Sequence, residues 1–109
     1  MSTATSPEAA PLFAALGDPT RLHLLARLSA DGPASIARLS ETGTISRQAV
    51  KKHLDVLARV GLVSGEHRGR EHVWCVQPRR LEDAHAYLDR IAGQWDDALE
   101  RLKRFVEEP

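Results

Sequence analysis

The sequence predicts a mainly α-helical fold with one small β-hairpin, in a single domain of 109 residues. Apolar residues recur at helical spacing through most of the chain. The period changes to strand-like alternation only between residues 62 and 76, and a long helical pattern follows. Residues 1–7 are small and polar, so we expect them to be disordered, with the folded domain over residues 8–109.

Strong start and stop signals divide the first part of the domain into short helices. We predict a helix over residues 8–16, which Gly17 ends. Asp18 suits the N-cap of the next helix, and Pro19 suits its first position, where the missing N–H costs nothing. We expect the inward face of this second helix to carry Leu22, Leu25 and Leu28.

Residues 34–61 have the order of a helix-turn-helix motif. We expect a brief extended piece at 34–36 and a short helix at about 37–42, with Leu39 as its main inward residue. Gly43 allows a tight turn into the next helix. Two short helices joined by a few residues that include glycine are typical of this motif.

The helix that follows this turn has an apolar face and a basic face. Ser46 suits its N-cap, Ile45 can pack behind it as a hydrophobic staple, and Gly61 suits the position after its end. The apolar face carries Val50, Leu54 and Leu57. The other face carries Arg47, Gln48, Lys51, Lys52 and Asp55. Such a surface on a braced helix suits reading of a DNA major groove, but alone it fits a merely solvated face equally well.

Residues 62–68 and 71–76 have the alternation of two β-strands. The turn between them is Arg68-Gly69-Arg70, and Trp74 on the second strand is expected to pack on the core. A hairpin placed after a helix-turn-helix is a wing. Arginines on both sides of its tip can lie along a phosphate backbone or enter a minor groove.

The net charge of the chain is zero, but the charge is unevenly distributed. Residues 46–70 carry six basic and two acidic side chains, whereas the flanking segments 1–45 and 71–109 are net acidic. The positive charge therefore coincides with the basic helix and the hairpin, which is the pattern expected of a DNA-facing surface on a neutral protein.

A helix is predicted over residues 79–107, after Pro78 closes the hairpin. Its apolar residues alternate at spacings of three and four, which makes a seam of Leu81, Ala84, Leu88, Ile91, Trp95, Ala98, Leu102 and Phe105. So small a domain cannot cover the whole seam, so we interpret the helix as a dimerisation element. The alternative is that it packs lengthwise on its own core.

The run ALGDPTR at residues 15–21, the run SRQAVKKHLDVLARVGLV at 46–63, the Arg-rich wing and the long last helix together resemble the ArsR family. These are dimeric winged helix-turn-helix transcriptional regulators of bacteria, and the resemblance covers about residues 10–107. The last helix, with Trp95 before a Leu-rich stretch, is similar to the SdpR-like autorepressor branch. The resemblance implies a homodimer, formed by the first and last helices, that binds an inverted repeat in double-stranded DNA.

The resemblance also implies roles for individual residues. Arg47 and Gln48 suit base reading, because arginine can fork onto guanine and glutamine can pair with adenine. Lys51 stands where the family usually has a small residue, which affects the identity of the operator. The implied DNA-binding residues are Ser46, Arg47, Gln48, Lys51, Lys52, His53, Arg68 and Arg70, with Lys52 and His53 either holding phosphate or bracing the helix. The implied dimerisation residues are Leu81, Leu88, Ile91, Trp95, Leu102 and Phe105.

Many family members bind metal, but we predict no metal site and no cofactor here. The short helix before the basic helix has no cysteine, so one type of family site is absent. Asp83 and His85 match the first half of another type, but the second half falls near Asp96 and Leu99, without the imidazole and the final ligand. Half a motif is also what a charged, solvated helix surface presents. His23, His67 and His72 show no ligand spacing and are expected to be surface or edge residues.

Several further functions are disfavoured by the sequence. The single cysteine, Cys75, has no partner in the chain, and we expect no redox role for it. We find no catalytic constellation, so an enzyme is not expected. The chain has no membrane-length apolar run and no signal peptide, which predicts a cytoplasmic protein. Two alternatives to a simple repressor stay open: a metal- or redox-sensing repressor of the same fold, and a winged-helix protein-interaction module without DNA binding. No inducer can be assigned from the sequence.

Overall fold

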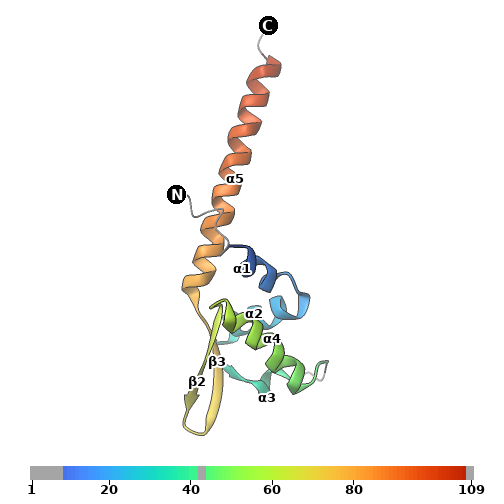
Figure 1. The fold of residues 1–109 in the computed structure, drawn as a ribbon, viewed down its shortest axis with the longest axis vertical. Coiled ribbons are helices and arrows are strands. Elements are labelled where there is room, and N and C mark those ends of the chain that lie inside the picture. The colour runs from blue at the N-terminus through green and yellow to red at the C-terminus, as the bar shows by residue number, and fades with distance from the viewer. Residues whose placement is uncertain (1–8, 42–43, 108–109) are drawn as a thin grey trace.

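The computed structural model describes residues 9–41 and 44–107. It has the predicted architecture, mainly helical with a hairpin (Figure 1). The predictions for residues 1–7 and for the turn at Gly43 lie outside the described residues. The elements in chain order are α1 (Ala9–Leu16), α2 (Pro19–Asp31), β1 (Ala34–Ser35), α3 (Ile36–Leu39), α4 (Arg47–Arg59), β2 (Val63–Arg68), β3 (Glu71–Val76) and α5 (Pro78–Glu107).

Helix α2 begins where the sequence predicts, because Asp18 caps it. The Asp18 carboxylate accepts a hydrogen bond from the backbone N–H of Arg21 at 3.0 Å. The predicted inward face is wrong at one position, since Leu22 is 50% exposed while Leu24, Leu25 and Leu28 are buried. At about 100° per residue, Leu22 lies roughly 110° around the helix from the centre of that buried stripe. Contacts of α2 with α1, α4 and β3 decide which stripe faces the core.

Helix α3 is shorter and starts earlier than predicted. It spans Ile36–Leu39 rather than residues 37–42, and Thr42 lies outside the described residues. The Ser35 hydroxyl accepts a hydrogen bond from the backbone N–H of Arg38, so this serine sets the earlier start. Leu39 is buried as expected, and α3 packs against α4.

Helix α4 matches the prediction closely. The Ser46 hydroxyl accepts from the backbone N–H of Ala49 at 3.1 Å, which confirms the N-cap. Gly61, just after the helix, has a φ of 83°, a conformation that side-chain-bearing residues rarely adopt. The inward face is completely buried, with zero exposure of Val50, Leu54 and Leu57. This burial holds α4 firmly against the rest of the domain.

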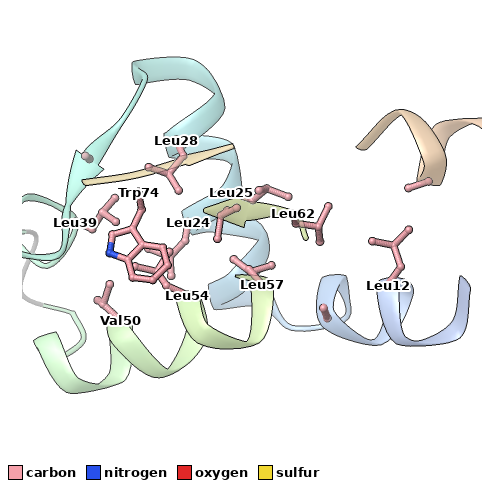
Figure 2. Close-up of a cluster of buried hydrophobic side chains, with 14 residues drawn as sticks. Leu12, Leu24, Leu25, Leu28, Leu39, Val50, Leu54, Leu57, Leu62 and Trp74 are labelled. Carbon is pink, nitrogen blue, oxygen red and sulfur yellow. The ribbon is translucent and has the colours of Figure 1, made fainter. Parts of the chain in front are cut away.

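The predicted hairpin is confirmed and is part of a larger sheet. Strand β3 lies between β1 and β2, and both pairings are antiparallel. Trp74 pairs with Ala34 of β1 and Gly65 of β2, and its side chain is only 5% exposed. Figure 2 shows its indole in the same cluster as the three buried leucines of α2 and the inward residues of α4. The sheet therefore ties the hairpin to the back of the helix-turn-helix motif.

Helix α5 leaves the domain after its first turns (Figure 1). Its 30 residues account for most of the 71 Å length of the molecule. Ala84 is buried, whereas Trp95 and Phe105 are 65% and 82% exposed. Lengthwise packing on its own core is thus wrong for the C-terminal half of the helix. No helix among the described residues has the length and apolar character needed to cross a membrane.

Candidate nucleic-acid interface

The outer face of α4 presents a polar, basic surface next to α3. Arg47, Gln48, Lys51 and Lys52 are all exposed. Together with Ser46 they line a shallow depression, whose remaining lining residues are Ile36 and Ala49. Five of the eight residues that the sequence implicates in DNA binding thus lie side by side on one surface, which we call the α4 surface.

The polar groups of the α4 surface differ in how far they are engaged within the protein. The ammonium of Lys51 lies 2.9 Å from both carboxylate oxygens of Asp55, one helical turn on. Arg47, Gln48 and Lys52 make no side-chain hydrogen bond or ion pair with the residues that the structure describes. Their donors are therefore free for an external acceptor. Lys51 could bind such an acceptor only by sharing its ammonium with Asp55 or by leaving the Asp55 carboxylate.

His53 lies apart from the α4 surface. Its side chain is 25% exposed, and its Nδ1 is 3.4 Å from Nη1 of Arg21 and 3.9 Å from Oδ2 of Asp18. These partners belong to the start of α2 and the residue before it. Of the two roles considered for His53, this environment fits bracing of the helix better than contact with phosphate.

Asp18 is the acidic member of this small group. The hydrogen bond from the Arg21 backbone N–H has the largest effect on the pKa of its carboxyl and lowers it. Desolvation opposes this, and the nearby Arg21 guanidinium lowers the pKa further by a smaller amount. The carboxylate is thus held in its charged form, which suits its role as the N-cap of α2.

The wing carries its arginines as predicted, at the same end of the molecule as α3 and α4 (Figure 1). Arg68 forms a close pair with Glu66, at 2.8 Å and 2.9 Å from the same carboxylate oxygen. Arg70 makes no ion pair or side-chain hydrogen bond within the described part of the chain. Gly69 at the tip has a φ of 62°, which permits the tight turn. Of the two wing arginines, Arg70 is therefore the one whose charge is unpaired among the described residues.

The structure brings together two histidines that the sequence interpretation treated separately. His67 and His72 face each other across the hairpin, with ring centroids 4.8 Å apart, and His72 in turn stacks on Trp74 at 5.0 Å. The tight turn predicted in the sequence could have revealed this contact. A turn that pairs Arg68 with Glu71 also pairs His67 with His72. The stack extends from the core toward the tip of the wing.

Each residue of the half motif for a metal site lies close to a side chain one turn away on α5. Asp83 lies 2.9 Å from Nη1 of Arg80, and His85 lies 3.3 Å from Asp89. Within residues 9–41 and 44–107, no three potential ligands converge on one point. Cys75 is half-buried, with its thiol 3.7 Å from the carbonyl oxygen of Ser64.

The fold that carries this surface also occurs in known proteins. An ArsR-like transcriptional regulator from Rhodococcus sp. RHA1 is 35% identical, with a TM-score of 0.83 over 96% of this chain and 98% of that one. The chain belongs to the ArsR family. This ArsR-family chain is also 35% identical to the HTH-type transcriptional regulator Rv2034 of Mycobacterium tuberculosis, over 98% of its length and 94% of that protein.

Two further similarities agree with this assignment. The family model of a helix-turn-helix domain matches residues 16–66, which include α2, α3 and α4. The HTH-type transcriptional repressor SmtB of Mycobacterium tuberculosis is 30% identical over 84% of this chain and 65% of that protein. The protein is therefore a DNA-binding transcriptional regulator, of a family that consists of regulators and not of enzymes.

Proposed function

We propose that this ArsR-family protein is a homodimeric repressor that acts in the cytoplasm and binds an inverted-repeat operator. The observation that carries the proposal is the free set of donors on the first two turns of α4, beside a wing whose Arg70 is also unpaired. A helix that is buried along its inner side and polar along its outer side can enter a major groove without rearrangement.

Each polar residue has a role that its chemistry supports. Arg47 would read guanine and Gln48 adenine, because both side chains can form two parallel hydrogen bonds to a base edge. Lys52 and Arg70 would neutralise phosphates. Ser46, at the start of α4, would contact the sugar-phosphate backbone of the DNA. Lys51 and Arg68 would also contact the DNA, once their ion pairs with Asp55 and Glu66 are replaced by contacts to the nucleic acid.

The dimer is supported by the apolar seam of α5. Isolated apolar residues on a surface are ordinary, but a sustained seam on a helix that projects from its domain needs a partner. The large seam residues that stand at least half exposed are Leu88, Trp95, Leu102 and Phe105. Together with the less exposed Leu81 and Ile91 they form the proposed dimer contact, with α1 alongside. Membership of the SdpR-like branch stays a prediction, and so does repression by this protein of its own promoter.

The proposal can be tested on any duplex DNA by measuring affinity as a function of salt. We expect log K to fall linearly with log salt, because each neutralised phosphate releases counterions. Lys52→Ala should weaken binding to all sequences and reduce the magnitude of the salt slope by about 1. Lys103→Ala, which removes an exposed lysine from the projecting part of α5, is the matched control and should change neither quantity.

An opposite result would overturn the proposal. If binding is absent, or is insensitive to salt and to loss of Lys52, the α4 surface is only solvated. The protein would then be better explained as a winged-helix module for protein partners.

A further inference from the structure

The contact between His53 and Arg21 joins the proposed DNA-reading helix to a different part of the molecule. His53 lies in the middle of α4, and Arg21 lies in the first turn of α2. Their side chains approach to 3.4 Å across 32 residues of sequence. Among the residues that the structure describes, His53 is the only side chain of α4 that makes a polar contact with another helix.

Arg21 also holds the C-terminal end of α1. Its Nε donates to the carbonyl oxygen of Ala15 at 2.6 Å, and its Nη2 donates to that of Ala14 at 3.4 Å. The last carbonyl groups of a helix have no partner within the helix, and a guanidinium satisfies them well in charge and in geometry. The same side chain therefore contacts both α1 and His53.

Helix α1 in turn packs against α5. Leu12 and Ala15 are buried in the common core, and the rings of Phe13 and Tyr87 lie 5.4 Å apart. A second link reaches α4 from α5 directly, because Nε of Arg80 donates to the carbonyl oxygen of Val60 at 2.9 Å. Helix α4 is thus connected to the proposed dimer helices at two points, near its middle and just after its end.

The chemistry of the pair assigns the direction of the hydrogen bond. An arginine side chain can only donate, so contact with Nδ1 requires a neutral imidazole whose Nδ1 carries no proton. Arg21 donates and His53 accepts. Asp18 completes the group, because its carboxylate accepts a hydrogen bond from the backbone N–H of Arg21. This bond fixes the start of α2, from which the guanidinium of Arg21 reaches both α1 and α4.

We propose that His53 and Arg21 are positioning residues that set the orientation of α4 relative to the dimer helices, and thereby the half-site spacing that the dimer accepts. The inference rests on the proposed function, because spacing has a meaning only for a dimer on an inverted repeat. In a two-fold dimer, a small rotation of each α4 changes the distance between the two reading surfaces twice over.

The test is a double-mutant cycle on an operator recovered by selection from random duplexes. His53→Leu removes the acceptor, and Arg21→Met removes the donors while keeping most of the side-chain stem. We expect each to weaken operator binding by roughly fivefold and the pair to cost little more than either alone, since residues in direct contact couple strongly. His53→Asn, which keeps an acceptor near the Nδ1 position, should restore most of the affinity.

Half-site spacing gives the readout that a purely stabilising contact would not change. Wild type should discriminate against operators whose spacing is altered by one base pair, and His53→Leu should discriminate less. Thermal unfolding of each variant shows that it is folded at the assay temperature. If Arg21→Met does not fold, Arg21→Lys takes its place in the cycle, because lysine keeps the charge but cannot reach all three acceptors.

The outcomes separate this inference from the proposed function. If wild type recovers no inverted repeat, the proposed function fails first. If it does, but the effects of His53→Leu and Arg21→Met simply add and spacing preference is unchanged, the positioning role is wrong. A His53→Leu variant that behaves like Lys52→Ala, with a reduced salt slope, would make His53 a phosphate contact instead.

Discussion

Asp18 makes the start of α2 dependent on pH. Its pKa is lowered in the folded protein from the ordinary 3.8, mainly by the hydrogen bond from the Arg21 backbone N–H, and the Arg21 guanidinium acts in the same direction. A lowered folded-state pKa means that its stabilisation is present above the unfolded value and is lost as pH falls through the folded one. Asp18→Asn keeps a capping side chain but removes the charge.

We therefore expect Asp18→Asn to be less stable than wild type at pH 7, and the difference to shrink toward pH 3. Urea unfolding followed by circular dichroism at both pH values checks this. A difference that stays constant with pH would show that the charge of Asp18 contributes nothing to the folded state.

Gly61 and Gly93 offer a matched pair of glycine substitutions. Gly61 has a φ of 83°, and a Cβ there would lie 3.1 Å from Cγ of Arg80. Gly61→Ala should destabilise by about 1–2 kcal/mol, which is the cost of a left-handed residue with a side chain. Gly93 lies within α5 with open space around it, so Gly93→Ala should stabilise by about 0.5–1 kcal/mol.

Thermal unfolding of the two variants beside wild type measures both effects. Equal shifts of Tm in the same direction would contradict the geometry described for Gly61.

Among the elements, the wing carries an arginine that the protein itself partly neutralises. Arg68 is paired with Glu66, and both are exposed at the tip of the hairpin. Glu66→Gln removes the competing carboxylate and should tighten binding to all DNA sequences, with a salt slope steeper by up to about 1. Fluorescence anisotropy on random duplexes measures both. Glu71→Gln, on the neighbouring strand and without an ion pair to either arginine, controls for the loss of negative charge alone.

The elements also show how far sequence reasoning reaches. Local signals predicted the caps at Asp18 and Ser46, the buried face of α4 and the hairpin turn, because each depends on residues within one or two turns. Leu22 was misplaced because the covering elements, and not the periodicity alone, select the buried stripe. The pairing of β1 with β3 and the contact of His53 with Arg21 join distant segments, and no local pattern predicts which segments meet.

At the scale of the whole molecule, the projecting half of α5 determines the assembly. Leu102 is 58% exposed in the single chain, so Leu102→Glu should leave the monomer fold intact. A two-fold dimer loses the contact twice, at about 1.5–3 kcal/mol for each apolar side chain, so dissociation should become at least roughly a hundredfold easier. Analytical ultracentrifugation measures it, with Lys103→Glu as the control on the adjacent polar position.

A dimer unaffected by Leu102→Glu would place the interface elsewhere. The predicted DNA-binding residues would keep their surface in that case, but the distance between the two copies of α4 would no longer follow from α5.

The central claim is that two copies of the α4 surface read one inverted repeat. Selection of binding sites from a pool of random duplexes, followed by sequencing, tests it most directly. We expect an inverted repeat whose half-site centres lie about 10–10.5 base pairs apart, or a multiple of that, so that both helices meet major grooves on one side of the DNA. Recovery of no enriched sequence, or of a single asymmetric site bound by one chain, would contradict the account.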